Sequence, residues 1–224
     1  MKTTTPDIIL LQEVTPDVFS SISDVLTSYT YTSLDSECGV EILWNSNYFG
    51  LKEKGFINLN IIDYPRRGLL WVRLFSLSNP KIIFFVCTTH LPWAGSSSEL
   101  TSGINQRIPC TLKICEELRS ITHVGEPIIL GGDLNDDFHP IRILKSEMGF
   151  VDVFESLDLS PPITHPVRPS DCEEEMRPNR TIDWILTNLP SSCKVIGAYT
   201  KSVRGGGWPP ASDHMPVVAI IEIK

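Results

Sequence analysis

The sequence predicts an α/β fold, a two-sheet α/β sandwich of mixed strand order, formed by a single domain over residues 1–224. Apolar runs of strand length recur along the chain, and several are almost continuous in Ile, Val, Leu and Phe, as in strands covered on both faces. Candidate helices lie between these runs, and no internal repeat divides the chain. With 42% hydrophobic residues, 224 residues suffice for one large core.

Eight apolar runs are candidate strands. They lie at residues 7–14, 40–45, 69–77, 81–90, 127–133, 181–188, 193–200 and 216–223. The third and fourth runs are separated by a short turn, so we expect them to form a hairpin-like pair. The run at 127–133 ends in two glycines and an acid, which favours close approach of backbone at the strand end.

Three segments are candidate helices. They lie at residues 15–29, 105–121 and 139–150. Thr15 and Pro16 supply a cap residue and a proline at the first helical position. Pro109 is expected to mark the beginning of the regular part of the second helix, and Gly149 is a candidate C-cap of the third.

The composition restricts the ligand and the compartment. A formal net charge of −8 argues against extended contact with duplex nucleic acid, but a small phosphate substrate is compatible where acidic side chains hold a divalent cation. The six cysteines form no CxxC pair, which favours reduced core thiols in a cytoplasmic or nuclear protein. The apolar run near the start is too short for a signal peptide or membrane span. Proline-rich residues 156–180 are interpreted as a solvated surface loop.

Polar side chains lie at the ends or edges of five separate apolar runs. They are Glu13, His90, Asp133 with Asn135, Asp183, and Asp213 with His214. Because ligands of α/β folds bind in the crevice at strand ends, we expect these side chains to converge. Taken singly, each has an alternative interpretation, such as a surface acid at position 13, a satisfied core histidine at 90 and an Asx turn at 133–135.

The motifs around these residues resemble those of the endonuclease/exonuclease/phosphatase superfamily. They are LLQEV (10–14), TTHL (88–91), GGDLN (131–135), TIDWIL (181–186) and SDHMPV (212–217). The resemblance covers residues 6–222 and implies a DNase-I-like fold and Mg²⁺-dependent hydrolysis of a phosphoester. Members with these motifs cleave very different phosphoesters, so the motifs indicate the superfamily and leave the substrate open.

The resemblance also implies roles for the first motif residues. Glu13 matches the principal Mg²⁺ ligand, with Mn²⁺ as an alternative cation. Asp133 matches the acid that orients or deprotonates the attacking water. Asn135 matches an amide that donates to a phosphate oxygen, and an amide there adds no negative charge beside the metal.

Further roles follow from the same resemblance. His214 matches the histidine that contacts the scissile phosphate, and Asp183 matches the carboxylate that holds this imidazole in one tautomer. Asp213 is implied to lie beside the metal as a direct or water-mediated ligand. His90 matches a second phosphate-facing histidine.

Two substrate-binding side chains are expected outside the motifs. Arg67 follows Arg66 at a strand edge, from which a guanidinium reaches a phosphate, and a solvated surface arginine is the alternative. Trp208 precedes Asp213 by five residues, where an indole either stacks on a base or packs under the loop.

The chain departs from the superfamily pattern at two places. The usual first strand, which ends in an Asn or Asp, is expected to be lacking, because only twelve residues precede Glu13. Its absence, or a truncated start, is expected to leave two neighbouring strands with unpaired edges and to reduce stability or activity. Residues 91–107 replace a shorter polar segment, and their Gly and Ser content predicts a mobile rim loop.

Three hypotheses of function follow. The first is a metal-dependent phosphoester hydrolase, phosphodiesterase-like or nuclease-like, with nucleic acid or a nucleotide favoured over an inositol phosphate or phospholipid headgroup. The second is a catalytically impaired member of the fold that serves as a binding or scaffold domain. The third, a zinc-binding regulator that uses the cysteines and His165, lacks suitable ligand spacing.

Overall fold

The structure, a computed structural model, describes residues 5–32, 38–165, 180–201 and 212–224. Its largest element is a six-stranded sheet of order β4-β5-β6-β7-β9-β8. The strands are β4 (Phe49–Asn58), β5 (Gly68–Ser76), β6 (Ile83–His90), β7 (Ile128–Asp133), β8 (Val151–Asp152) and β9 (Asp183–Asn188). Strands β6 and β7 run parallel and the other neighbours antiparallel, so the predicted mixed order is confirmed. The expected hairpin-like pair is the antiparallel pair β5–β6.

The second layer of the sandwich consists of two small sheets. One has the order β1-β3-β2, formed by β1 (Ile8–Gln12), β2 (Tyr29–Tyr31) and β3 (Val40–Asn45), and the other pairs β10 (Lys194–Thr200) with β11 (Val217–Glu222). Both pack on one buried cluster, since Leu10 of β1 and Ile221 of β11 contact the core that contains Val86 of β6. Within the described ranges, β1 pairs only with β3 and β11 only with β10.

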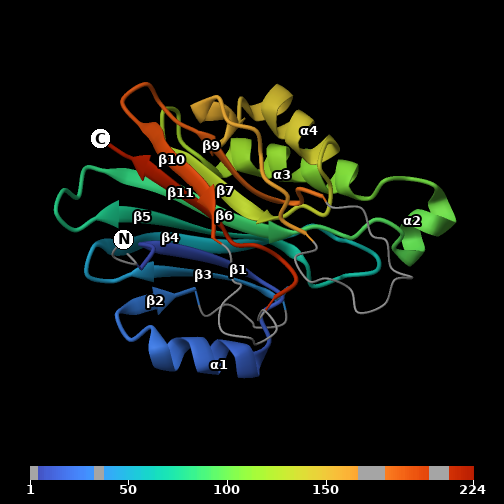
Figure 1. The fold of residues 1–224 in the computed structure, drawn as a ribbon, viewed down its shortest axis with the longest axis horizontal. Coiled ribbons are helices and arrows are strands. Elements are labelled where there is room, and N and C mark those ends of the chain that lie inside the picture. Colours follow the sequence, from blue (N-terminus) through green and yellow to red (C-terminus); the bar gives the residue numbers. More distant parts are fainter. Residues whose placement is uncertain (1–4, 33–37, 166–179, 202–211) are drawn as a thin grey trace.

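Two helices cover the other face of the six-stranded sheet. They are α3 (Arg107–Ile121) and α4 (His139–Met148), which Figure 1 shows side by side on the face away from β1 and β3. Phe85 and Cys87 join the helix-side core, whereas Val86 joins the core under the small sheets. This alternation is the two-residue period of a strand covered on both faces, and it explains the continuous apolar runs.

The helix boundaries differ in part from those predicted. Helix α1 (Pro16–Val25) has the expected Thr15 cap, but it ends early and residue 29 begins β2. Helix α3 begins two residues before Pro109, which is tolerated because the amides of the first turn have no partner within the helix. Helix α4 ends as expected at Gly149, with a φ of +67°.

The rim segment 91–107 contains a short helix, α2 (Ser97–Ser102), that was not predicted. Figure 1 shows it projecting beyond the end of the sheets. Buried Arg107 anchors it by donating to the Glu99 carboxylate at 2.8 and 2.9 Å, and Arg107 Nε also donates to Asp136 at 3.2 Å. The Gly and Ser content therefore gave no sign of the ion pairs that hold this segment.

The five described cysteines are buried thiols, as expected of reduced core residues. No helix in the described part of the chain is long and apolar enough to cross a membrane. A short 3-10 helix, η2 (Glu155–Leu157), follows β8 and overlaps the start of the predicted loop, of which residues 166–179 lie outside the described part of the chain.

Candidate active site at the strand ends

The ends of β6, β7 and β9 place three ionisable side chains in one row. His90 is opposite Asp133 in the parallel register of β6 and β7, and Asp133 is opposite Asp183 in the antiparallel register of β7 and β9. The His90 Nε2 atom lies 3.4 Å from Asp133 Oδ2. Because β9 runs opposite to β7, its first residue meets the last residue of β7. Three predicted site residues therefore converge at one edge of the sheet.

The two glycines before Asp133 permit the close packing around this edge. A Cβ atom at Gly131 would lie 2.5 Å from Leu10 Cδ1, so the Leu10 side chain of strand β1 would have to shift. Gly132 has a φ of +153°, and a Cβ there would lie 2.1 Å from the carbonyl oxygen of Thr89 on β6. The strand end is bare because two neighbours occupy the space of the missing side chains.

Replacing Gly132 by alanine should lower the free energy of unfolding by about 1–3 kcal/mol, because backbone must move to admit the Cβ. Gly125→Ala is the matched control, since Gly125 also has a positive φ but nothing lies within 4 Å of its Cβ position. Urea unfolding monitored by tryptophan fluorescence measures both. Equal losses for the two variants would contradict the proposed contact with Thr89.

Asp183 and His214 form a hydrogen-bonded pair beside this row. The His214 Nδ1 atom lies 2.9 and 3.0 Å from the two Asp183 carboxylate oxygens. Burial opposes the charged imidazolium, but the hydrogen bond and negative charge of Asp183 outweigh it and raise the pKa of His214 to about 9. Thr164 Oγ1 fixes Asp183 by accepting from its backbone N–H at 3.1 Å. His214 is therefore held as a charged imidazolium. Asp183 bonds to Nδ1, so the Nε2–H of this ring is left to donate to another group.

Asp133 is a buried carboxylate surrounded by other negative groups. Burial is the main cause that raises its pKa from 3.8 to about 7, and the charge of Asp183 adds to the increase. His214 opposes the shift, as does the backbone N–H of Asn135, which donates to Asp133 Oδ1 at 2.8 Å. A carboxylate with this pKa is able to take up a proton near neutral pH.

Asn135 holds Asp133 in position. Its Nδ2 atom donates to the Leu91 carbonyl at 2.9 Å and to Asp133 Oδ2 at 3.3 Å, and its backbone has a φ of +50°. The amide that was predicted to donate to phosphate is thus directed at protein acceptors in this structure. Left-handed backbone at a non-glycine residue is uncommon and gathers at functional sites.

His90 is a buried, neutral imidazole. Burial, with smaller effects of Arg67 and His214, lowers its pKa to about 3. A neutral ring has one N–H donor and one acceptor, so its role differs from that of charged His214.

Glu13 follows β1 with a φ of +56° and lines a cavity of about 410 Å³ together with His90. Arg66, Arg67 and Tyr64 form another part of the wall, and the Arg67 guanidinium lies 4.1 Å above the Tyr64 ring. The structure thus brings the predicted metal ligand Glu13 and the predicted substrate ligand Arg67 to one cavity. Tyr64 was missed, although an aromatic residue just before two arginines is a recognisable signal.

Two groups of three side chains have ligand atoms within 4.8 Å of one another among the described residues. They are Asp133, Asp183 and His214, and His165, Asp213 and His214. Glu13 belongs to neither group, but its charge raises the pKa of Asp133. Three acids therefore repel one another around buried Asp133, and a divalent cation would relieve that repulsion. The carboxylate oxygens of these acids are ligands that fit Mg²⁺ or Mn²⁺.

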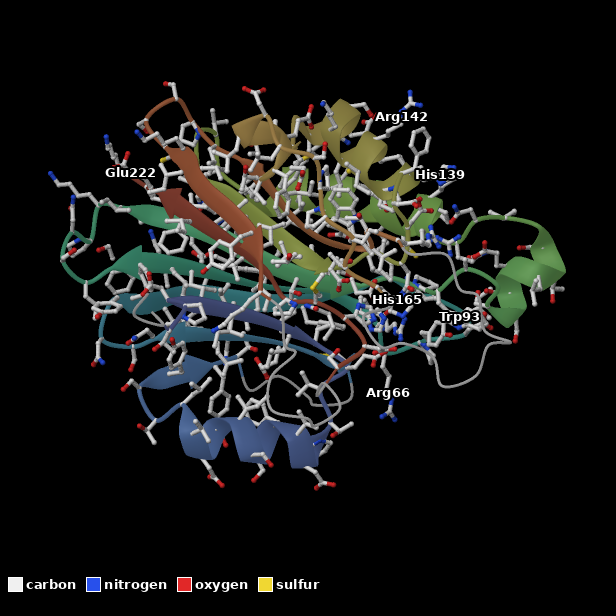
Figure 2. All side chains as sticks on the ribbon, viewed as in Figure 1. Arg66, Trp93, His139, Arg142, His165 and Glu222 are labelled. Atoms are coloured by element: carbon white, nitrogen blue, oxygen red, sulfur yellow. The ribbon has the colours of Figure 1, made fainter. Side chains whose placement is uncertain are left out.

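His165, considered above only as a ligand of a zinc-binding regulator, is a neighbour of the site that the motifs did not include. Its Nε2 atom lies 3.5 Å from Asp213 Oδ2, and its ring centroid lies 4.5 Å from that of His214. It comes from the proline-rich segment interpreted as a surface loop. Figure 2 shows His165 toward the end of the molecule where Trp93 lies, with Glu222 at the other end. Trp208, the remaining predicted ligand, lies outside the described residues.

Solved structures of 16–20% sequence identity share this fold. D. rerio TDP2 complexed with single strand DNA product matches with a TM-score of 0.79 and 16% identity, over 97% of this chain and 86% of that chain. The human Nocturnin catalytic domain with bound sulfate anion matches with a TM-score of 0.74 and 20% identity, over 98% and 81%. The mannosyl-6-phosphatase of Bacteroides thetaiotaomicron matches with a TM-score of 0.70 and 20% identity, over 96% and 85%.

Neither a protein-family model nor a curated protein sequence matches the chain. Other solved structures with the same fold are endonuclease/exonuclease/phosphatase family proteins, such as one from Bacteroides thetaiotaomicron with a TM-score of 0.70. The chain therefore has the DNase-I-like fold that the motifs implied.

Proposed function

We propose that the protein is a Mg²⁺-dependent phosphoester hydrolase of the phosphodiesterase or nuclease type. The observation that carries the proposal is the cluster of Asp133, Asp183 and His214, in which a carboxylate with a raised pKa lies beside a carboxylate-held imidazolium. Hydrolysis of a phosphoester requires both a base for water and a cationic donor for the phosphate. The fold shared with known phosphoester-cleaving proteins supports it.

In this mechanism Asp133 orients the attacking water and accepts its proton. Asn135 keeps the carboxylate in place through its two hydrogen bonds. Ionisation of Asp133 is favoured when positive charge is near, and Mg²⁺ held by Glu13, with Asp213 as a second ligand, would supply that charge and neutralise the phosphate.

His214 donates from Nε2 to a phosphate oxygen while Asp183 keeps the proton on Nδ1. Negative charge that develops on the phosphate is stabilised by an imidazolium already in place, so no reorganisation is needed during the reaction. Neutral His90 lies next to Asp133, where its ring is able to form a hydrogen bond. Arg67 lines the cavity on the Glu13 side, where it would meet a substrate phosphate.

The favoured substrate class is a nucleic acid or nucleotide phosphodiester. The structure of D. rerio TDP2 contains a single strand DNA product, and a single strand needs a smaller electrostatic contact than a duplex. A net charge of −8 is compatible with a short contact in which a metal ion bridges the protein and the substrate phosphate. The alternative substrate class comprises phosphorylated sugars, inositol phosphates and phospholipid headgroups. The fold shared with the mannosyl-6-phosphatase supports this alternative.

The test is turnover of bis-p-nitrophenyl phosphate and a panel of oligonucleotides by the purified protein. Mg²⁺ should support p-nitrophenol release, EDTA should abolish it, and Glu13→Gln should raise the Mg²⁺ concentration needed by roughly tenfold or more, because a carboxylate ligand is lost. Glu222→Gln is the control, since that acid pairs with Lys194 and Lys224 away from the site.

Absence of turnover with every substrate, together with no Mg²⁺ binding by calorimetry, would contradict the hydrolase and favour the binding or scaffold domain. An identical Mg²⁺ requirement in wild type and Glu13→Gln would remove Glu13 from the metal site.

A further inference from the structure

A second set of ligand atoms lies beside the proposed hydrolytic centre. His165, Asp213 and His214 each offer one ligand atom, and these atoms lie within 4.8 Å of one another. The set differs from the acidic cluster because it contains two imidazoles and only one carboxylate. Its side chains are reachable, with exposed fractions of 14% for His165, 52% for Asp213 and 27% for His214.

Backbone hydrogen bonds hold the two chain segments that carry these ligands. The backbone N–H of His165 donates to Arg180 at 3.0 Å, and the N–H of Arg180 donates back to His165 at 2.7 Å. The N–H of Met215 donates to the Thr164 carbonyl at 2.8 Å. The residues next to His165 and His214 are thus bonded to each other, so the two rings are brought together by paired backbone and not by side-chain packing alone.

The His214 ring is also oriented as a metal-binding imidazole is. Its Nδ1 atom is engaged by Asp183 at 2.9 Å, which leaves Nε2 as the ligand atom. A carboxylate that fixes one nitrogen of a histidine while the other binds metal is the usual arrangement around zinc ligands. The Asp213 carboxylate, about half exposed, has its Oδ2 atom 3.5 Å from His165 Nε2.

We propose that His165, Asp213 and His214 form a binding site for a borderline transition-metal cation of the Zn²⁺ class. Imidazole nitrogen with one carboxylate favours Zn²⁺, Co²⁺ or Cu²⁺, whereas Mg²⁺ favours oxygen ligands. The consequence for activity rests on the proposed function: a cation that binds His214 Nε2 displaces the proton of this nitrogen to solvent, so the nitrogen no longer donates to phosphate. Transition metals of this class therefore inhibit the Mg²⁺-dependent reaction through His165.

Metal binding is measured directly by titrating the whole protein with Co²⁺ and following its visible absorption, and by calorimetry with Zn²⁺. We expect His165→Ala and His165→Gln each to weaken binding at least about tenfold, as for loss of a metal ligand or its support. His139→Ala is the matched control, because His139 Nδ1 also lies 3.0 Å from an aspartate, Asp136, but has no second imidazole. Thermal melts of each variant check that the fold is intact.

Unchanged Co²⁺ spectra and affinities in both folded His165 variants would overturn the proposal, as would a loss as large in His139→Ala. In the activity measurement, Zn²⁺ is titrated into the Mg²⁺-dependent hydrolysis reaction. The Zn²⁺ concentration that inhibits should be roughly tenfold higher for the His165 variants than for the wild type. If no hydrolysis is observed with Mg²⁺ alone, the proposed function fails, while the Co²⁺ and Zn²⁺ binding measurements still decide the metal site.

Discussion

Replacing His214 by glutamine is expected to lower kcat/KM by about 10²–10³-fold, the usual loss when one preorganised donor to a developing oxyanion is removed. Glutamine retains hydrogen-bonding atoms but carries no positive charge. The expected loss therefore reports the imidazolium that Asp183 maintains. Steady-state hydrolysis of bis-p-nitrophenyl phosphate in saturating Mg²⁺ measures it, and His139→Gln is the control imidazole.

The pH dependence of this variant provides an independent check. The folded pKa of His214 is raised to about 9, from 6.5. In the folded protein the imidazolium is thus retained through neutral pH, and its contribution to activity is lost as pH rises through about 9. Wild-type activity should fall on the alkaline side near pH 9, and His214→Gln should lack this decline. A decline of the same size and midpoint in the variant would assign it to another group.

Replacing Asp133 by asparagine is expected to lower kcat by about 10³-fold or more and, in the metal-free protein at pH 8, to increase the free energy of unfolding by up to about 4 kcal/mol. Burial and the charge of Asp183 raise the pKa of Asp133 to about 7 in the folded state. A raised carboxylate pKa means that the ionised form destabilises the fold, so stability falls as pH rises from about 4 to about 7. Asparagine keeps the shape and one acceptor oxygen for the Asn135 backbone N–H, but it removes the buried charge and the second acceptor, which faces Asn135 Nδ2.

Chemical unfolding in EDTA at pH 4 and pH 8 measures this effect. The gain in stability should be present at pH 8 and nearly absent at pH 4, where Asp133 is protonated in the folded protein. Asp137→Asn, an exposed acid four residues later, should change stability by less than about 0.5 kcal/mol. An Asp133→Asn variant less stable than the wild type at pH 8 would contradict a destabilising buried charge.

Much of the fold follows from local sequence signals. Continuous apolar runs predicted strands β6 and β7, because both faces of these strands are covered by separate cores. The Thr15-Pro16 start and the Gly149 end predicted helix boundaries because each residue has a specific backbone role there. The two glycines before Asp133 predicted close backbone approach, which the contact with Thr89 confirms.

Other features depend on contacts between distant segments. Strand β4 was missed because its middle residues, Lys52 to Lys54, are polar and exposed at an edge of the sheet. Helix α2 was missed because buried Arg107 stabilises it from outside. Neither feature has an apolar period of its own.

The sequence predicted which residues belong to the candidate site better than it predicted how these residues are arranged. The motifs indicated Asp133 and Asp183, but their adjacency is set by the antiparallel register of β7 and β9, which no local pattern specifies. His165 is brought to His214 by its own backbone hydrogen bonds to Arg180 and by the bond from the Met215 N–H to the neighbouring Thr164 carbonyl, across a large separation in sequence. Nonlocal pairing of this kind is invisible to periodicity and spacing.

The most direct test of the proposed hydrolytic centre is the rate of p-nitrophenol release from bis-p-nitrophenyl phosphate at saturating Mg²⁺ by three proteins: wild type, Asp133→Asn and Asp137→Asn. Removal of the base that activates water should reduce kcat by about 10³-fold or more in Asp133→Asn, within the usual contribution of general base catalysis. Asp137→Asn should keep the wild-type rate, because its side chain is half exposed and pairs with Arg180. Equal rates for all three proteins would contradict the assignment of Asp133 as the water-activating residue.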